Sequence, residues 1–585
     1  MTPILDPRNG DIEDDAASTK RRSLLSLMGS LLAEISLPKL VLVWMLLIGF
    51  PGLLLGAAPL LASLWIASVV SKVANLFTEV LPALLLLPLV AIGWFVGRPL
   101  LQLAENSFWS LNALAVQPVY TAFREGLRHL AERPLAASTS EDRRALFRVC
   151  IAAISGLTMC GLGIGVVVLV WPASRWVGSL ADLGAPFQLV PVVLANSVVL
   201  ISGYFAAAAL IWGIADATMA QPRNLRAYAV LSDGDRTWRI AHLSDIHTVG
   251  ERYGFRIESG RSGPRGNERL RQTLARLQEI HATHPLDVVL LTGDLTDAGR
   301  SAEWAEFFAA FAAYPQLAEL VVALPGNHDV NVVDRASPAR MDLPTSPTKR
   351  LRQIRTISAL GMLQGRRLHV LDKRDRRIGG SLADALQPHA VNMATFADNG
   401  SARLSRSLAE LWAAIFPMVL PPDREDGLGI IVLNSNAETH FSFTNALGLV
   451  SAEQARACSI AIDQYPRARW IVALHHHVVE YPQEAKELSE RIGTALINGS
   501  WFIRRLLHLS RRAVIMHGHR HVDWIGECGG LQIISAPSPV MGSSGHSETY
   551  FYVHTFAIGA DGRLRLLEPE RINLCDQRIT NEAWL

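Results

Sequence analysis

Apolar positions form long uninterrupted runs in the first part of the chain and only short runs in the remainder. Each long run exceeds or approaches the roughly 20 apolar residues that a helix needs to cross a bilayer. We therefore predict an all-α membrane domain over residues 38–220 with about four transmembrane helices, although Pro51 and Pro59 interrupt the first. The four runs free of Asp, Glu, Lys and Arg are residues 40–71, 80–97, 149–174 and 183–214.

The segment before the first predicted span, residues 1–37, is mainly a polar tail. Its last part, "SLLSLMGSLLAEISL" after Lys20 to Arg22, is too short and too polar to span a bilayer. This stretch is typical of an amphipathic helix lying on the membrane, and a plain exposed helix is the alternative.

Basic residues are concentrated in the connection between the second and third predicted spans. By the positive-inside rule this connection, the N-terminus and the C-terminal part all face the cytoplasm. We expect a multi-pass protein of the inner or plasma membrane, with the lipid bilayer as a partner and the C-terminal domain in the cytoplasm. The arginines of this connection are Arg124, Arg128, Arg133, Arg143, Arg144 and Arg148.

From residue 225 onward, short apolar runs alternate with polar helical patterns. "WRIAHLSDIH", "LDVVLLTGD", "AELVVALPGNHD", "GIIVLNSN", "RWIVALHHHVVE" and "RAVIMHGHRH" read as strands, and "GNERLRQTLARLQEIHATHP" reads as an amphipathic helix. This alternation predicts an α/β domain with largely parallel strands over residues 225–585.

Five of these predicted strands end in Asp, Asn or His. In parallel sheets ligands bind outside the carboxyl ends of the strands, so these side chains are expected to meet. Carboxylate, amide and imidazole ligands together suit Mn, Fe or Zn, and a pair of such ions can hold the attacking and leaving oxygens of a displacement at phosphorus. The candidates are Asp245, His247, Asp294, Asn327, His328, Asp329, His475, His476, His477, His517, His519 and His521.

Overall composition narrows the classes of function. Hydrophobic residues make up 50% of the chain and its mean hydropathy is +0.22, which fits a membrane part joined to a soluble part. A net charge of +2 predicts no nucleic-acid polymer as partner. The 5 cysteines include no CxxC pair, which fits a reducing compartment.

The ordered blocks "DIH" (245–247), "GD" (293–294), "GNHD" (326–329), "HHH" (475–477) and "GHRH" (518–521) resemble the calcineurin-like metallophosphoesterases. They are most like the branch that holds class III cyclic nucleotide phosphodiesterases. The resemblance covers roughly residues 238–575 and implies a four-layer αββα sandwich, here preceded by the transmembrane domain. It also implies a metal-dependent phosphoric ester hydrolase with a binuclear metal centre.

The resemblance further implies an ordered set of ligands. One metal ion would be held by Asp245, His247, Asp294 and His521, and the other by Asp294, Asn327, His476 and His519. His328 would protonate the leaving oxygen, Asp329 would orient His328, and a metal-bound hydroxide would be the nucleophile.

The choice within residues 475–477 is open, because Val478 stands where relatives often have proline. We select His476 and expect its neighbours to point away. His517 is expected in the core or behind the ligands.

Residues 330–428 form an insertion that a minimal relative would not need. Its basic runs, "KRLRQIR" (349–355) and "GRRLHVLDKRDRR" (365–377), predict a cap that supplies cations to a phosphate, a surface for anionic headgroups, or a solvated helical face. The apolar "LWAAIFPMVL" is expected in a cap core.

Three functions remain open at this point. The first is hydrolysis of a phosphodiester, with a cyclic nucleotide as one candidate. The second is hydrolysis of a lipid-linked phosphodiester or pyrophosphate, because membrane attachment would bring the domain to such a substrate. The third is a non-catalytic, metal-occupied sensor or binding module.

Overall fold

In a computed structural model the described residues form two compact units, one within residues 35–219 and one within residues 220–585. The predicted N-terminal amphipathic helix and the second predicted span (80–97) lie outside the described residues. The structure describes residues 45, 49–76, 116–132, 140–179, 182, 184, 186–232, 234–250, 266–333, 347–399, 401–439, 442–482, 496–541, 549–559 and 561–574.

The unit of residues 35–219 is helical in its described part. Three helices there are long and apolar enough to cross a membrane, and they coincide with the first, third and fourth predicted spans. α6 packs extensively against α7, and α3 also contacts α7. The elements are α3 (Phe50–Leu76), α5 (Gln117–Glu132), α6 (Glu141–Val170), η3 (Trp171–Ala173), η5 (Pro186–Leu189) and α7 (Val190–Ala217).

The second unit contains a six-stranded sheet whose central strands follow the predicted runs. β2 (Arg236–Leu243), β3 (Val288–Leu291) and β4 (Val321–Ala323) are parallel neighbours in that order. β13 (Thr549–Ile558) joins β2 in the antiparallel sense and in turn pairs with β14 (Leu564–Leu566) and β15 (Glu570–Leu574).

A nine-stranded sheet lies beside the first, with the order β1-β11-β12-β10-β9-β8-β7-β5-β6. Its middle strands β8, β9, β10 and β12 are parallel. The strands are β1 (Arg223–Asn224), β5 (His369–Asp372), β6 (Arg377–Ser381), β7 (Met418–Leu420), β8 (Leu428–Val432), β9 (Arg469–Ala473), β10 (Ala513–His517), β11 (Trp524–Cys528) and β12 (Leu531–Ser535).

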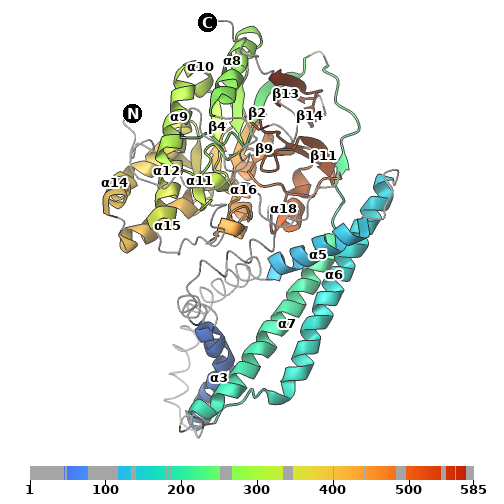
Figure 1. Ribbon diagram of the computed structural model, residues 1–585, viewed down its shortest axis with the longest axis vertical. Coiled ribbons are helices and arrows are strands. Elements are labelled where there is room, and N and C mark those ends of the chain that lie inside the picture. Colours follow the sequence, from blue (N-terminus) through green and yellow to red (C-terminus); the bar gives the residue numbers. More distant parts are fainter. Residues whose placement is uncertain are drawn as a thin grey trace, which may run out of the picture. The chain divides into compact units, whose positions relative to one another are not determined.

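Both sheets belong to one hydrophobic core, which agrees with the predicted α/β class. Ile240 and Val289 of the first sheet and Ile471 and Val514 of the second are completely buried in it. Helices surround the two sheets (Figure 1). They are α8 (Glu268–Thr283), α9 (Ser301–Ala312), α10 (Pro315–Ala318), α11 (Asn327–Val330), α12 (Pro347–Gln364), α13 (Leu382–Leu386), η7 (Gln387–His389), α14 (Ala390–Asn399), α15 (Ala402–Ile415), η8 (Ser442–Thr444), α16 (Ala452–Gln464), α18 (Gly499–Leu506) and η9 (Leu507–Leu509).

The described part of the insertion extends the nine-stranded sheet and does not form a separate cap. β5, β6 and β7 continue that sheet beyond β8, and α12 packs against β4 and α11. The apolar run predicted for a cap core lies in the shared core, where Trp412 and Phe416 are buried.

The first basic run of the insertion is buried, so its interpretation as a solvated face is wrong. Lys349, Arg350, Arg352 and Arg355 on α12 are all buried. Lys349 Nζ donates to the backbone oxygen of Thr439 at 2.6 Å, Arg350 donates to the side chain of Gln353, and Arg352 and Arg355 donate to the backbone oxygens of Val330 and Gly299. The second run is different, because residues 374–377 are exposed.

Candidate metal centre

Candidate ligands from both sheets converge at the carboxyl ends of their strands. Three parallel strands of the first sheet supply Asp245 and His247 after β2, Asp294 after β3 and Asn327 after β4. Two parallel strands of the second sheet supply the remaining histidines after β9 and β10. Because the two sheets share a core, all five strand ends reach one place.

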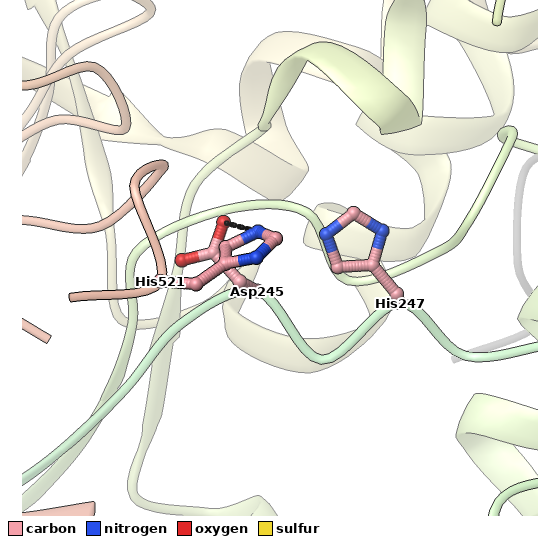
Figure 2. Close-up of side chains that lie close together, drawn as sticks. All are labelled: Asp245, His247 and His521. Atoms are coloured by element: carbon pink, nitrogen blue, oxygen red, sulfur yellow. Dashed lines mark ion pairs between the residues drawn. The ribbon is translucent and has the colours of Figure 1, made fainter. Parts of the chain in front are cut away.

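One cluster joins Asp245, His247 and His521, whose ligand atoms all lie within 4.8 Å of one another. The Oδ1 atom of Asp245 lies 3.3 Å from Nε2 of His521. Figure 2 shows this ion pair with the imidazole of His247 beside it. A carboxylate and two imidazoles are a donor set that first-row transition metals favour.

A second cluster joins Asp294, His475 and His519. Nε2 of His475 lies 3.2 Å from Oδ2 of Asp294 and 3.0 Å from Nδ1 of His519. Oδ1 of Asn327 lies 3.1 Å from the same His475 nitrogen.

Asp294 lies between the two clusters. Its Oδ2 atom is 3.6 Å from Nε2 of His247 in the first cluster and 3.2 Å from Nε2 of His475 in the second. Its Oδ1 atom accepts a hydrogen bond of 2.8 Å from the backbone N–H of His328. The position is the one that a carboxylate bridging two metal ions requires.

The second cluster fits a bound cation. Nδ1 of His475 lies 2.7 Å from the backbone oxygen of Thr292, and since that oxygen can only accept, Nδ1 carries the hydrogen. Nε2 of the neutral ring then directs its lone pair toward the oxygens of Asp294 and Asn327. Such a convergence of electron pairs is stable only around a positive charge.

The electrostatics of His475 agree with this view. Burial disfavours the charged ring, but the carboxylates of Asp294 and Asp245 outweigh burial and raise the pKa of His475 to about 9. The negative charge that raises this pKa would equally favour a bound cation at the same place. In the first cluster, Asp297 Oδ1 lies 3.1 Å from Nδ1 of His247, which leaves Nε2 of that ring toward Asp294.

The backbone at the candidate ligands adopts an uncommon conformation. Left-handed φ angles are rare for residues other than glycine, and they gather at functional sites where surrounding structure maintains the strain. The residues with φ between 44° and 74° include Asp245, His247, Asp294, His519 and His521.

Glycine is required at Gly326 by close approach. A Cβ atom there would lie 2.1 Å from both the backbone nitrogen and Oδ1 of Asp294. The loops after β3 and β4 can therefore touch only if this residue has no side chain.

His475 contacts Asp294, whereas the histidine selected from the sequence, His476, contacts Ser435. Nδ1 of His476 lies 2.9 Å from Oγ of Ser435, and its ring fills the space beside Gly448. His477 turns instead to Glu480, with Nε2 3.1 Å from Oε1. The physical reason is register: β9 ends at Ala473, and the bend after it points the first histidine of the run at Asp294.

His328 and Asp329 have different roles in the geometry. The ring of His328 lies 4.4 Å from the ring of His247, centroid to centroid, so it borders the first cluster. Its Nδ1 atom is held by the backbone oxygen of Asp297 at 2.7 Å.

The prediction that Asp329 orients His328 does not match this arrangement. Asp329 instead accepts hydrogen bonds from the backbone N–H groups of Leu295, Thr296 and Gly326 and from the Thr296 hydroxyl. It thereby ties the loop after β3 to the loop after β4. The buried His517, stacked on Tyr481, is a core residue as expected.

Asp297 is a site residue that the sequence reading missed. It contacts His247 through its carboxylate and His328 through its backbone oxygen. The sequence offers one sign of this role, because Asp297 stands in "GDLTDAG", three residues after Asp294.

Comparison with known proteins agrees with this geometry. The family model described as calcineurin-like phosphoesterase matches residues 239–390. Residues 239–390 are therefore similar to calcineurin-like phosphoesterases. No curated protein matches the chain.

Solved structures similar to this chain include two phosphatases and a nucleotidase. A dimetal phosphatase from Danio rerio is 11% identical with a TM-score of 0.33, and the match covers 58% of this chain and 99% of that one. An NAD nucleotidase from Haemophilus influenzae is 11% identical (TM-score 0.30, 58% of this chain and 56% of that one). A purple acid phosphatase from Lupinus luteus is 10% identical (TM-score 0.24, 56% and 50%). The chain spans about half the length of the last two, and these likenesses are too weak to transfer a substrate.

Proposed function

We propose that the protein is a membrane-anchored phosphodiesterase whose phosphoesterase domain works in the cytoplasm with two divalent or transition metal ions. The observation that carries this proposal is the position of Asp294, whose Oδ2 atom lies within 3.6 Å of a histidine nitrogen in each cluster. The family match at residues 239–390 supports the reaction class.

The residues around Asp294 divide into two ligand sets. Bound ions at such a site neutralise charge on a phosphate and lower the pKa of a water molecule, and the mixed oxygen and imidazole donors suit Mn, Fe or Zn. One set would be Asp245, His247, Asp294 and His521, and the other would be Asp294, Asn327, His475 and His519.

His328 is the candidate general acid. With Nδ1 committed to the Asp297 oxygen, Nε2 is the atom that can gain and lose a proton. The backbone N–H of His328 also holds Asp294, so the acid and the bridging carboxylate are positioned together. Protonation of a leaving alkoxide by this ring would complete the cleavage of a phosphodiester.

Membrane anchorage is proposed from composition. Three helices are long and apolar enough to cross a bilayer, and arginines gather in the connection between residues 124 and 148. The same helices favour a second candidate function, hydrolysis of a lipid-linked phosphodiester or pyrophosphate, because the attachment would confine the domain to the plane of its substrate.

The test uses the full chain purified in detergent, stripped with a chelator and restored with Mn²⁺. It is assayed on bis(p-nitrophenyl) phosphate, p-nitrophenyl phosphate, a cyclic nucleotide and a lipid-linked pyrophosphate. We expect Mn²⁺-dependent turnover with the diester ahead of the monoester. Turnover restricted to the lipid-linked compound supports the second candidate, and tight metal binding without any turnover contradicts both and supports a sensor module.

A further inference from the structure

α5 buries a polar face and exposes an apolar one. Its buried residues recur at the spacing of a single helical face, and all but the aromatic Tyr120 are polar or charged, which reverses the pattern of an ordinary surface helix. They are Gln117, Tyr120, Thr121, Glu125, Arg128 and Glu132.

The other face of α5 is apolar and open. Val119 is 49% exposed and Leu130 is 61% exposed. Phe123 and Leu127, between them along the helix, are half-buried. An exposed edge of this kind on a helix of this length needs an apolar environment to cover it.

Ion pairs fix the rotation of α5 about its axis. Arg124 pairs with Asp216 near the end of α7, and Glu132 lies 3.6 Å from Nε of Arg148 on α6. Within α5, Glu132 also accepts a hydrogen bond of 2.8 Å from Nε of Arg128. Turning the apolar edge inward would break all of these contacts.

α5 lies where the apolar helix α6 begins and the apolar helix α7 ends. Gly156 lies against Gly213 and Gly163 against Ala206, so α6 and α7 are antiparallel. The charged start of α6 and the end of α7 therefore lie at the same side of the unit. α5 contacts both helices there (Figure 1).

α6, which contacts α5, also exposes apolar side chains. Leu146 and Phe147, in the first turns of α6, are 63% and 42% exposed, and Leu157 further along is 63% exposed. An aqueous partner protein would have to cover this α6 surface as well, whereas a bilayer covers both at once.

We propose that α5 is an interfacial helix, lying along the membrane boundary with Val119, Phe123, Leu127 and Leu130 among lipid acyl chains and with its charged face locked to α6 and α7. This inference depends on the membrane anchorage in the proposed function. It assigns a lipid contact surface to a segment outside the three apolar helices.

The experiment places a fluorescent label on α5 in the full chain. A variant whose native cysteines are alanine receives Leu130→Cys, is labelled with nitrobenzoxadiazole and is reconstituted in phosphatidylcholine nanodiscs. Val119→Cys repeats the measurement at the other end of the edge, and both residues are exposed, so neither change removes a packed side chain. Leu157→Cys on α6 and the exposed Glu279→Cys on α8 are the membrane and aqueous references.

We expect a nitroxide carried by lipid to quench the labels at positions 130 and 119 several-fold more than the label at position 279. Aqueous cobalt should quench the label at position 279 more than those at positions 130 and 119. If the lipid nitroxide quenches the label at position 157 but only cobalt quenches the two α5 labels, α5 is not an interfacial helix. The membrane anchorage is unaffected by that result. Protection of the α5 labels from both quenchers also overturns it, in favour of a protein partner. Absence of lipid quenching at position 157 refutes the anchorage itself.

Discussion

Nδ1 of His328 lies 2.7 Å from the backbone oxygen of Asp297, and this contact determines which nitrogen of the ring can exchange a proton. Because the carbonyl accepts, Nδ1 keeps its hydrogen and Nε2 is left for the reaction. The same residue donates its backbone N–H to Asp294. The proposed general acid, after β4, and the proposed bridging carboxylate, after β3, are therefore held together by a direct hydrogen bond.

Replacing His328 tests this role. We expect His328→Gln to lower kcat for a diester with an alkyl leaving group by about 10²-fold to 10⁴-fold, the usual contribution of a positioned acid. The loss should be smaller for a nitrophenyl ester, whose leaving group needs no proton. Metal content should stay at the wild-type level, and His508→Gln, at an exposed histidine, serves as the matched control. Equal losses for both esters would contradict the general-acid role.

The assignment of His475 is tested by metal content. Removing a group that merely supports a ligand weakens metal affinity by roughly 10-fold to 100-fold, so removing a ligand should weaken it at least as much. We expect His475→Ala to bind about one equivalent less metal in elemental analysis after dialysis against a weak chelator. His476→Ala should keep both equivalents, since its Nδ1 contacts Ser435. The reverse result would restore the choice of His476.

Gly326 offers a steric test of the contact between two loops. In Gly326→Ala the new Cβ would meet Asp294 at 2.1 Å, so one loop must move and the bridging carboxylate with it. We expect loss of most metal binding and a lower melting temperature. Gly380→Ala is the matched control, because a Cβ there lies 3.5 Å from its nearest neighbour, an ordinary contact. Similar metal binding in the two variants would show that the loops are not in contact.

His554 predicts a pH dependence of stability. Burial lowers the pKa of His554 to about 3, whereas an imidazole in the unfolded chain titrates near 6.5. The unfolded state therefore binds a proton that the folded state does not, and stability falls as the pH drops from about 6.5 toward 3, by about 1.4 kcal/mol per pH unit.

His554→Phe keeps the ring contacts and removes this proton. Melting temperatures of the metal-free protein, measured from pH 7 to pH 4, should fall less steeply for the variant than for the wild type. Parallel curves would mean that His554 already exchanges protons in the folded state.

Strand positions could be predicted because short apolar runs that end in polar residues have few other interpretations. β3, β4, β9 and β10 lie within their predicted runs, and β2 begins two residues before its run. The meeting of Asp294 with histidines from other strand ends also followed, since parallel strands bring their carboxyl ends together.

The histidine of the run that contacts Asp294 could not be predicted, because all three residues are the same type. The choice depends on where the chain leaves β9, at Ala473, and on a contact between Ser435 and the ring of His476, which are about forty positions apart along the chain. The burial of Arg352 and Arg355 had no local signal either. Their partners are backbone carbonyls of Val330 and Gly299, which carry no mark in the sequence.

Each metal cluster combines residues from both sheets: Asp245 with His521, and Asp294 with His475. Neither sheet alone can assemble even one of the two sites. Metal content should therefore report whether the entire domain is folded. A chain truncated anywhere between β2 and β10 should bind no metal ion at all, instead of losing only one of the two.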